Sequence, residues 1–66
     1  MQNKIKVARA ENDFTQEDLA KKIGVSRQTI NSIEKGRYVP STVLALKMSR
    51  LFSKSVNELF VLEEGD

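Results

Sequence analysis

The sequence predicts an all-α fold in which five short helices form a single domain, residues 1–66. Three observations predict this fold. Apolar residues recur at helical spacing, strand-type alternation is almost absent, and a residue suited to a helix N-cap precedes four of the apolar stretches. The chain has 66 residues, of which 39% are apolar and 30% are charged, an ordinary composition for one small globular domain.

The first two helices are predicted on either side of a short turn. Ile5 and Ala8 give the first helix an apolar side, and we expect it to stop at Asn12-Asp13, because both residues tolerate the left-handed conformation. Thr15 is suited to the N-cap of the second helix, whose first turn carries two acids that the helix dipole favours. This helix is expected to run to about Ile23.

The next residues predict a helix-turn-helix motif. Gly24 fits the left-handed position that ends a helix, and Ser26 is suited to the next N-cap. Two short helices joined by a three- or four-residue turn with glycine are typical of this motif. The third helix carries Ile30 and Ile33 on its inner side and is expected to stop at Gly36.

The remaining chain predicts two more helices and a short tail. Pro40 makes residues 37–40 a loop, and Ser41 caps a fourth helix with an apolar face of Leu44, Ala45, Met48, Leu51 and Phe52. Ser55 caps a short fifth helix that contains Val56, Leu59 and Phe60. Residues 61–66 are expected to form a tail, or a brief strand at Val61 and Leu62.

The outer face of the third helix is the candidate functional surface. With its isoleucines turned inward, it presents hydrogen-bonding side chains and no carboxylate: Arg27, Gln28, Asn31, Ser32 and Lys35. In the major groove of DNA, Arg pairs with guanine, and Gln or Asn pairs with adenine. The alternative is an ordinary solvated face. Residues 1–57 hold all 11 Lys and Arg but only five of the nine Asp and Glu, a net charge of +6, which suits a polyanionic partner.

Composition excludes other classes of function. Without Cys or His, the chain lacks disulfides, the usual zinc ligands and the commonest general base, and so small a domain leaves little room for a ligand pocket. We therefore expect no enzyme activity, cofactor, metal or small-molecule ligand. No apolar stretch is long enough to cross a membrane, and the N-terminus does not read as a signal peptide, so a cytoplasmic protein is expected.

The stretch QEDLAKKIGVSRQTINSIEKG, residues 16–36, resembles the Xre family, the helix-turn-helix family of lambdoid phage repressors and Cro. The match extends through Pro40-Ser41 and Leu59-Phe60, and the chain looks most like the compact cytolysin-repressor type. The resemblance implies a five-helix, lambda-repressor-like domain that binds double-stranded DNA. Two positions depart from the family pattern, since relatives often have glycine at Asp13 and a glycine–aliphatic pair at Ser53-Lys54.

The resemblance also implies roles for individual residues. Arg27, Gln28 and Ser32 match positions that read base edges, and Thr29 and Asn31 are further candidates for base reading. The expected phosphate contacts are Gln16, Ser26, Lys35 and Arg37. Arg9 and Glu34 match residues that form an internal ion pair.

One recognition helix reads too few base pairs to find a site alone, so we expect a homodimer on a pseudo-palindromic operator. Its interface is expected in the apolar run Leu59, Phe60, Val61 and Leu62, with Val7 and Leu46 as further candidates. The alternative is that this run completes the monomer core. The expected function is a repressor. The other functions considered are an antitoxin that regulates its own toxin pair and a protein-interaction module.

Overall fold

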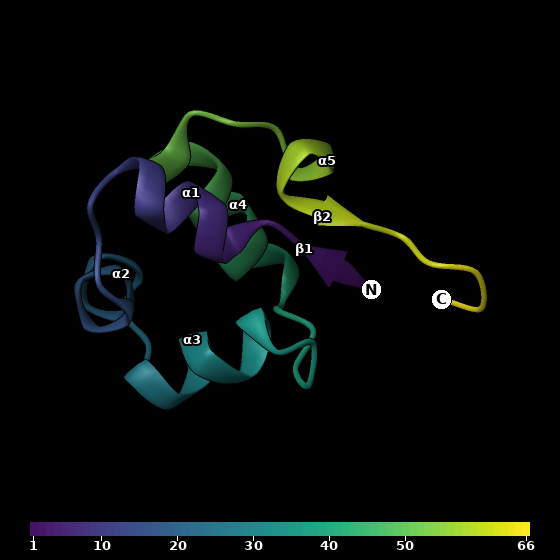
Figure 1. Ribbon diagram of the computed structural model, residues 1–66, viewed down its shortest axis with the longest axis horizontal. Coiled ribbons are helices and arrows are strands. Elements are labelled where there is room, and N and C mark those ends of the chain that lie inside the picture. Colours follow the sequence, from purple (N-terminus) through teal and green to yellow (C-terminus); the bar gives the residue numbers. More distant parts are fainter.

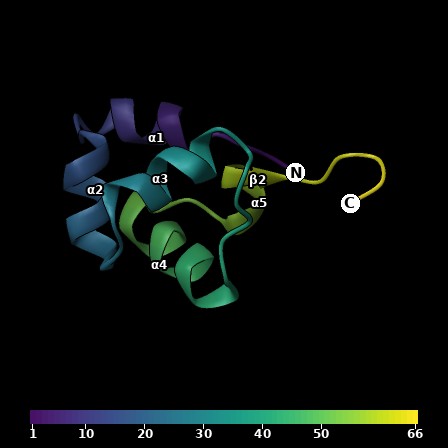
Figure 2. The same ribbon diagram turned by 90° about the horizontal axis from the view of Figure 1, so that it is seen from below.

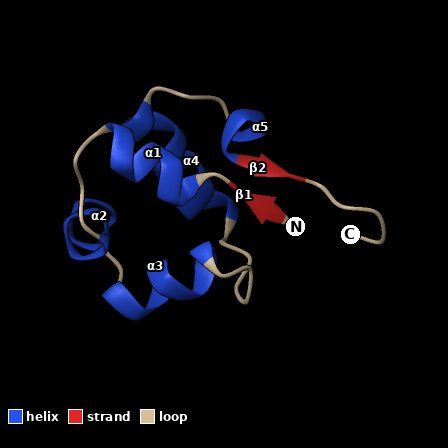
Figure 3. Cartoon of the chain, in the orientation of Figure 1, coloured by secondary structure: helices blue, strands red, loops and turns tan.

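The computed structural model describes residues 1–66 and consists of five helices and a two-stranded sheet (Figure 1). The helices are α1 (Ile5–Glu11), α2 (Gln16–Ile23), α3 (Arg27–Glu34), α4 (Thr42–Phe52) and α5 (Val56–Leu59). Strands β1 (Gln2–Asn3) and β2 (Phe60–Val61) form the sheet beside α5 (Figure 3). The predicted helical fold is confirmed, and a small sheet is added to it.

The predicted starts of α2 to α5 agree with the structure because local side chains set them. Each predicted N-cap accepts a hydrogen bond from the backbone N–H three residues later: Thr15, Ser26, Ser41 and Ser55. Gly24 ends α2 in the left-handed conformation, with φ +76°. Asp13 takes the same conformation at φ +57° after α1, as does Ser53 at φ +53° after α4. Asp13 and Ser53 therefore both adopt a conformation that glycine adopts more readily.

The prediction for the C-terminal segment was partly wrong. Helix α5 ends at Leu59, and Phe60 lies in β2 with an extended backbone, while Leu62 lies beyond the strand. Strand β2 pairs antiparallel with β1, so that Gln2 faces Val61 and Asn3 faces Phe60. Two-residue strands are too short to show alternation, and the partner of β2 lies at the other end of the sequence, so no local pattern could reveal this pairing.

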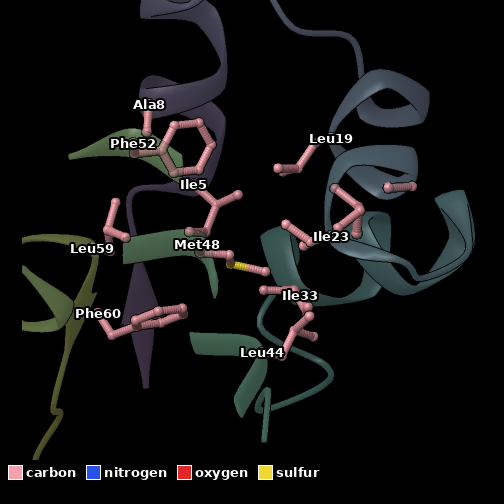
Figure 4. Close-up of a cluster of buried hydrophobic side chains, with 12 residues drawn as sticks. Ile5, Ala8, Leu19, Ile23, Ile33, Leu44, Met48, Phe52, Leu59 and Phe60 are labelled. Carbon is pink, nitrogen blue, oxygen red and sulfur yellow. The ribbon is translucent and has the colours of Figure 1, made fainter. Parts of the chain in front are cut away.

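The core forms where all five helices meet (Figure 4). It contains 12 buried apolar residues and no buried polar residue. Met48 of α4 is fully buried and extends toward Ile33 of α3, whereas Ile5 approaches from α1 and Leu19 from α2. Ile30 and Ile33 are both fully buried, as predicted, so α3 is fixed in its rotation about its own axis. No helix has both the length and the apolar character needed to cross a membrane.

Two capping boxes make the stability of this fold depend on pH. In α2, the Asp18 carboxylate accepts a hydrogen bond from the backbone N–H of Thr15, which lowers the pKa of Asp18, and Ser55 does the same for Glu58 in α5. A carboxyl with a lowered pKa in the folded state stabilises the fold above its unfolded pKa, and this stability is lost as pH falls through the folded pKa.

We therefore expect the difference in unfolding free energy between the wild-type chain and Asp18→Asn to shrink as pH falls below the ordinary aspartate pKa of 3.8. Urea denaturation at a series of pH values measures this difference. A difference that stays constant from neutral pH into the acid range would contradict the role of the ionised carboxylate.

Candidate nucleic-acid interface

Helix α3 lies on the side of the domain that faces the viewer in Figure 2, and its outer side is polar. Burial of Ile30 and Ile33 turns the opposite side of the helix outward. Arg27, Gln28 and Lys35 are exposed on this side, and Thr29, Asn31 and Ser32 are half-buried at its base. The structure therefore presents all the predicted base-reading residues on one side of the domain.

Two shallow polar hollows run along this face. One is lined by Ser26, Gln28, Thr29, Asn31, Ser32, Arg37 and Tyr38, and the other by Gln16, Arg27, Gln28 and Asn31. Every predicted base or phosphate contact except Lys35 borders one of them. We refer to the lining residues together as the polar face. It contains no acidic residue. Sequence reasoning missed Tyr38, an exposed residue whose only signal was its place directly after Arg37.

The hydroxyl groups at the start of α3 are partly occupied. Ser26 Oγ accepts the backbone N–H of Thr29 at 3.1 Å and lies 2.9 Å from Thr29 Oγ1. One hydroxyl donates to the other, so the pair keeps a single hydroxyl hydrogen to offer outward. Ser26 therefore serves first as the helix cap, and a phosphate contact from this pair would use that one hydrogen.

The single carboxylate of α3 is turned inward and paired. Arg9 Nε donates to Glu34 Oε2 at 2.8 Å and Arg9 Nη2 donates to Glu34 Oε1 at 3.2 Å, while Arg9 Nη1 donates to the Phe14 carbonyl at 2.9 Å. The Glu34 side chain is only 6% exposed. Its hydrogen bond raises the pKa of Arg9, which stays charged. The structure thus contains the ion pair that the resemblance implied, and the pair keeps negative charge away from the polar face.

Gln16 joins the start of α2 to this ion pair and to the polar face. Its Nε2 donates to Glu34 Oε1 at 3.2 Å and to Asn31 Oδ1 at 3.3 Å. Both amide hydrogens of Gln16 are therefore used inside the protein. Only Oε1 remains, and an oxygen acceptor has no hydrogen to donate to a phosphate oxygen.

The predicted dimer interface needs correction. Leu59 is fully buried in the monomer core and offers no surface to a second copy. Phe60 is only 7% exposed, and its remaining surface borders the groove described next. Short α5 places Leu59 inward, and pairing of β2 with β1 turns Phe60 inward. Val61 is 41% exposed and Leu62 is 78% exposed.

A different apolar surface lies beside them. A groove, here named the apolar groove, is lined by Met1, Val39, Pro40, Thr42, Ala45, Leu46, Val56 and Phe60. Leu46 is therefore part of it, but Val7 lies in a separate hollow between α1 and α5, together with charged residues such as Lys4 and Glu11. Within the loop that follows α3, Arg37 and Tyr38 border the polar face, and Val39 and Pro40 border the apolar groove.

Comparison with known proteins places this geometry in a family. The profile of the helix-turn-helix family matches residues 5–59. An uncharacterized HTH-type transcriptional regulator of Methanocaldococcus jannaschii is 52% identical over 66 residues, which cover the full length of both chains.

Two solved structures have a fold similar to that of this chain. A candidate DNA-binding protein from Bacteroides fragilis superposes with a TM-score of 0.78 at 31% identity, covering 88% of this chain and 94% of that chain. The restriction-modification controller protein C.AhdI from Aeromonas hydrophila superposes with a TM-score of 0.76 at 28% identity, covering 85% of each chain.

Proposed function

This chain belongs to the helix-turn-helix family, and from that premise we propose that it regulates transcription by binding a pseudo-palindromic DNA operator as a homodimer. The observation that carries the proposal is the polar face, where donor side chains gather on a rigid helix and the only carboxylate of that helix is paired inward. A helix of this kind fits the major groove, in which base edges carry distinct hydrogen-bonding patterns.

Within this proposal, residues of the polar face and the neighbouring Lys35 have two roles. Arg27, Gln28, Thr29, Asn31 and Ser32 read base edges from the groove. Lys35 and Arg37 lie at the C-terminal end of α3 and in the following loop, where they bind phosphate, and the free hydroxyl hydrogen of the Ser26–Thr29 pair supports a phosphate contact at the other end. Occupation of the operator excludes polymerase, so the proposed regulation is repression.

The base-reading role of Arg27 makes a measurable prediction. Arg27→Ala is expected to cost about 1–3 kcal/mol of binding free energy at the preferred site and to relax specificity at one base pair in each half-site, because Arg27 is exposed at the start of α3 and borders the polar face. Fluorescence anisotropy on the preferred duplex and on its single-base variants measures both effects.

Lys6→Ala is the matched control, since it removes one exposed positive charge from α1, away from the polar face. It should leave specificity unchanged. Equal loss on every DNA sequence for Arg27→Ala would show that Arg27 binds phosphate and does not read bases. Binding by the wild-type chain should weaken with salt, with a log–log slope of about 0.9 per phosphate neutralised.

The proposed dimer interface is the apolar groove. Val39 is 63% exposed and Leu46 is 56% exposed, and both line this groove. Val61 and Leu62 extend the exposed apolar surface at the end of β2. In the proposed dimer, a twofold axis passes through this groove and the two copies of α3 lie on one side of the DNA.

Leu46→Glu is expected to convert the dimer to a monomer at tens of micromolar, since a carboxylate would have to be desolvated in the interface. Sedimentation velocity measures the change. Val7→Glu is the control, because Val7 is 57% exposed but lies in the other hollow, and it should leave the dimer intact. A wild-type chain that sediments only as a monomer at this concentration would contradict the proposed interface.

Selection of DNA from a random-sequence library by the purified chain tests the proposed function. The expected result is one enriched motif of two inverted half-sites whose centres lie about 34 Å apart, one helical turn. Enrichment of no motif would overturn the proposal. Capture of a second small protein, as an antitoxin would show, or of an unrelated protein without any DNA binding would replace it with one of the other two functions.

A further inference from the structure

The hydrogen bonds around Gln16 fix the orientation of a base-reading amide. The starting point is Glu34, whose carboxylate is held by Arg9 in a nearly buried position. An ionised carboxylate has oxygen acceptors only, so the group that approaches it must be a donor. The Gln16 amide therefore turns its Nε2 toward Glu34, and the reverse orientation would place two oxygens against each other.

The fixed orientation of the Gln16 amide in turn fixes the orientation of the Asn31 amide. Gln16 Nε2 carries a second hydrogen, which it donates to Asn31 Oδ1 at 3.3 Å. Asn31 must therefore present its Oδ1 to Gln16, and its Nδ2 points away from that bond. Asn31 Nδ2 has no partner within the protein, and Asn31 lines both hollows of the polar face. Four side chains thus form one chain of fixed orientation, Arg9 to Glu34 to Gln16 to Asn31.

We propose that Gln16 is a positioning residue that makes Asn31 a hydrogen-bond donor to the major groove and thereby selects guanine over adenine at one base pair of each half-site. The inference rests on the proposed DNA binding. A freely rotating asparagine pairs with adenine by accepting from N6 and donating to N7. With Oδ1 directed at Gln16, Asn31 turns its Nδ2 hydrogens toward the groove, and guanine provides adjacent acceptors at N7 and O6 without a donor.

This role differs from the phosphate contact that the resemblance implied for Gln16. A phosphate contact strengthens binding to all sequences alike, whereas a positioning residue changes the preference at the base pair that it controls. Substitution of Gln16 should therefore change base preference only if Gln16 is a positioning residue. Loss of a phosphate contact, or of a purely structural role, would leave base preference unchanged.

The test compares DNA selection by the wild-type chain, Gln16→Leu, Asn31→Ala and the double variant. Asn31→Ala identifies the base pair that Asn31 reads. At that pair the wild-type chain should prefer guanine over adenine about tenfold, and Gln16→Leu should reduce this ratio below about twofold while other pairs keep their preference. The double variant should match Asn31→Ala, because Gln16 acts through Asn31. Gln28→Ala is the control and should relax a different base pair.

Two selection results would overturn the inference alone: a uniform loss of affinity in Gln16→Leu with base preferences unchanged, or a wild-type preference for adenine at the Asn31 pair. A wild-type chain that enriches no sequence would overturn the proposed function together with it.

A second measurement needs neither DNA nor a variant. In the free wild-type chain, the side-chain amides of Gln16 and Asn31 should have NMR order parameters near those of rigid backbone, about 0.85. Values below about 0.6 would show that the two amides are mobile and would overturn the inference even if Gln16→Leu failed to fold.

Discussion

Arg9→Met is expected to lower the free energy of unfolding by about 3–5 kcal/mol, because it leaves the charge of Glu34 without its partner inside the protein. The Glu34 side chain is 6% exposed and Arg9 supplies two of its three hydrogen bonds, the third coming from Gln16. The variant also removes the donor to the Phe14 carbonyl. Urea denaturation at neutral pH measures the loss.

Two comparison variants distinguish loss of the Arg9–Glu34 ion pair from a general effect of charge on stability. Lys6→Met removes an equal charge from an exposed position of the same helix and should change stability by less than about 0.5 kcal/mol. Arg9→Met combined with Glu34→Leu removes both charges and should recover part of the stability. An Arg9→Met chain as stable as Lys6→Met would mean that the ion pair contributes nothing to the fold.

Ile30→Ala is expected to cost about 2–5 kcal/mol of stability, since Ile30 is fully buried and the truncation leaves a cavity between α3 and the core. A domain this small has little stability to spare, so a large fraction of the variant should be unfolded. DNA binding should then fall with the folded fraction, and base preferences should stay unchanged in the molecules that do bind. Circular dichroism during thermal unfolding, together with anisotropy on the preferred duplex, measures both quantities.

Ile30→Val should cost only about 0.5–1.5 kcal/mol, as the smaller truncation leaves most of the contacts in place. Val43→Ala shortens an aliphatic side chain that is 63% exposed and should scarcely affect folding. An Ile30→Ala chain with wild-type stability would contradict the anchoring of α3 by its inner face.

The helical parts of this fold were predictable because their determinants are local. Thr15, Ser26, Ser41 and Ser55 each cap the helix that directly follows, and Gly24 takes the left-handed turn that its sequence position required. Helical periodicity then placed Ile30 and Ile33 inward and fixed which side of α3 faces out.

The errors arose where the determinants lie far apart in the sequence. Phe60 was predicted in a helix, but its pairing with Asn3 places it in a strand. Leu59 was predicted in a dimer interface, but it is fully buried in the monomer core. The Arg9–Glu34 pair came from the family resemblance, because nothing in the spacing of two residues 25 apart indicates a contact. The Gln16–Asn31 bond depends on how α2 crosses α3 and could not be predicted from either helix alone.

The central claim is that α3 meets the DNA with the side opposite Ile30 and Ile33. Titration of the isotope-labelled chain with its selected duplex, followed by NMR of the backbone and side-chain amides, tests it most directly. The largest shifts are expected along α3, at the start of α2 and in residues 36–38. Shifts confined to the hollow between α1 and α5, with α3 unchanged, would contradict it.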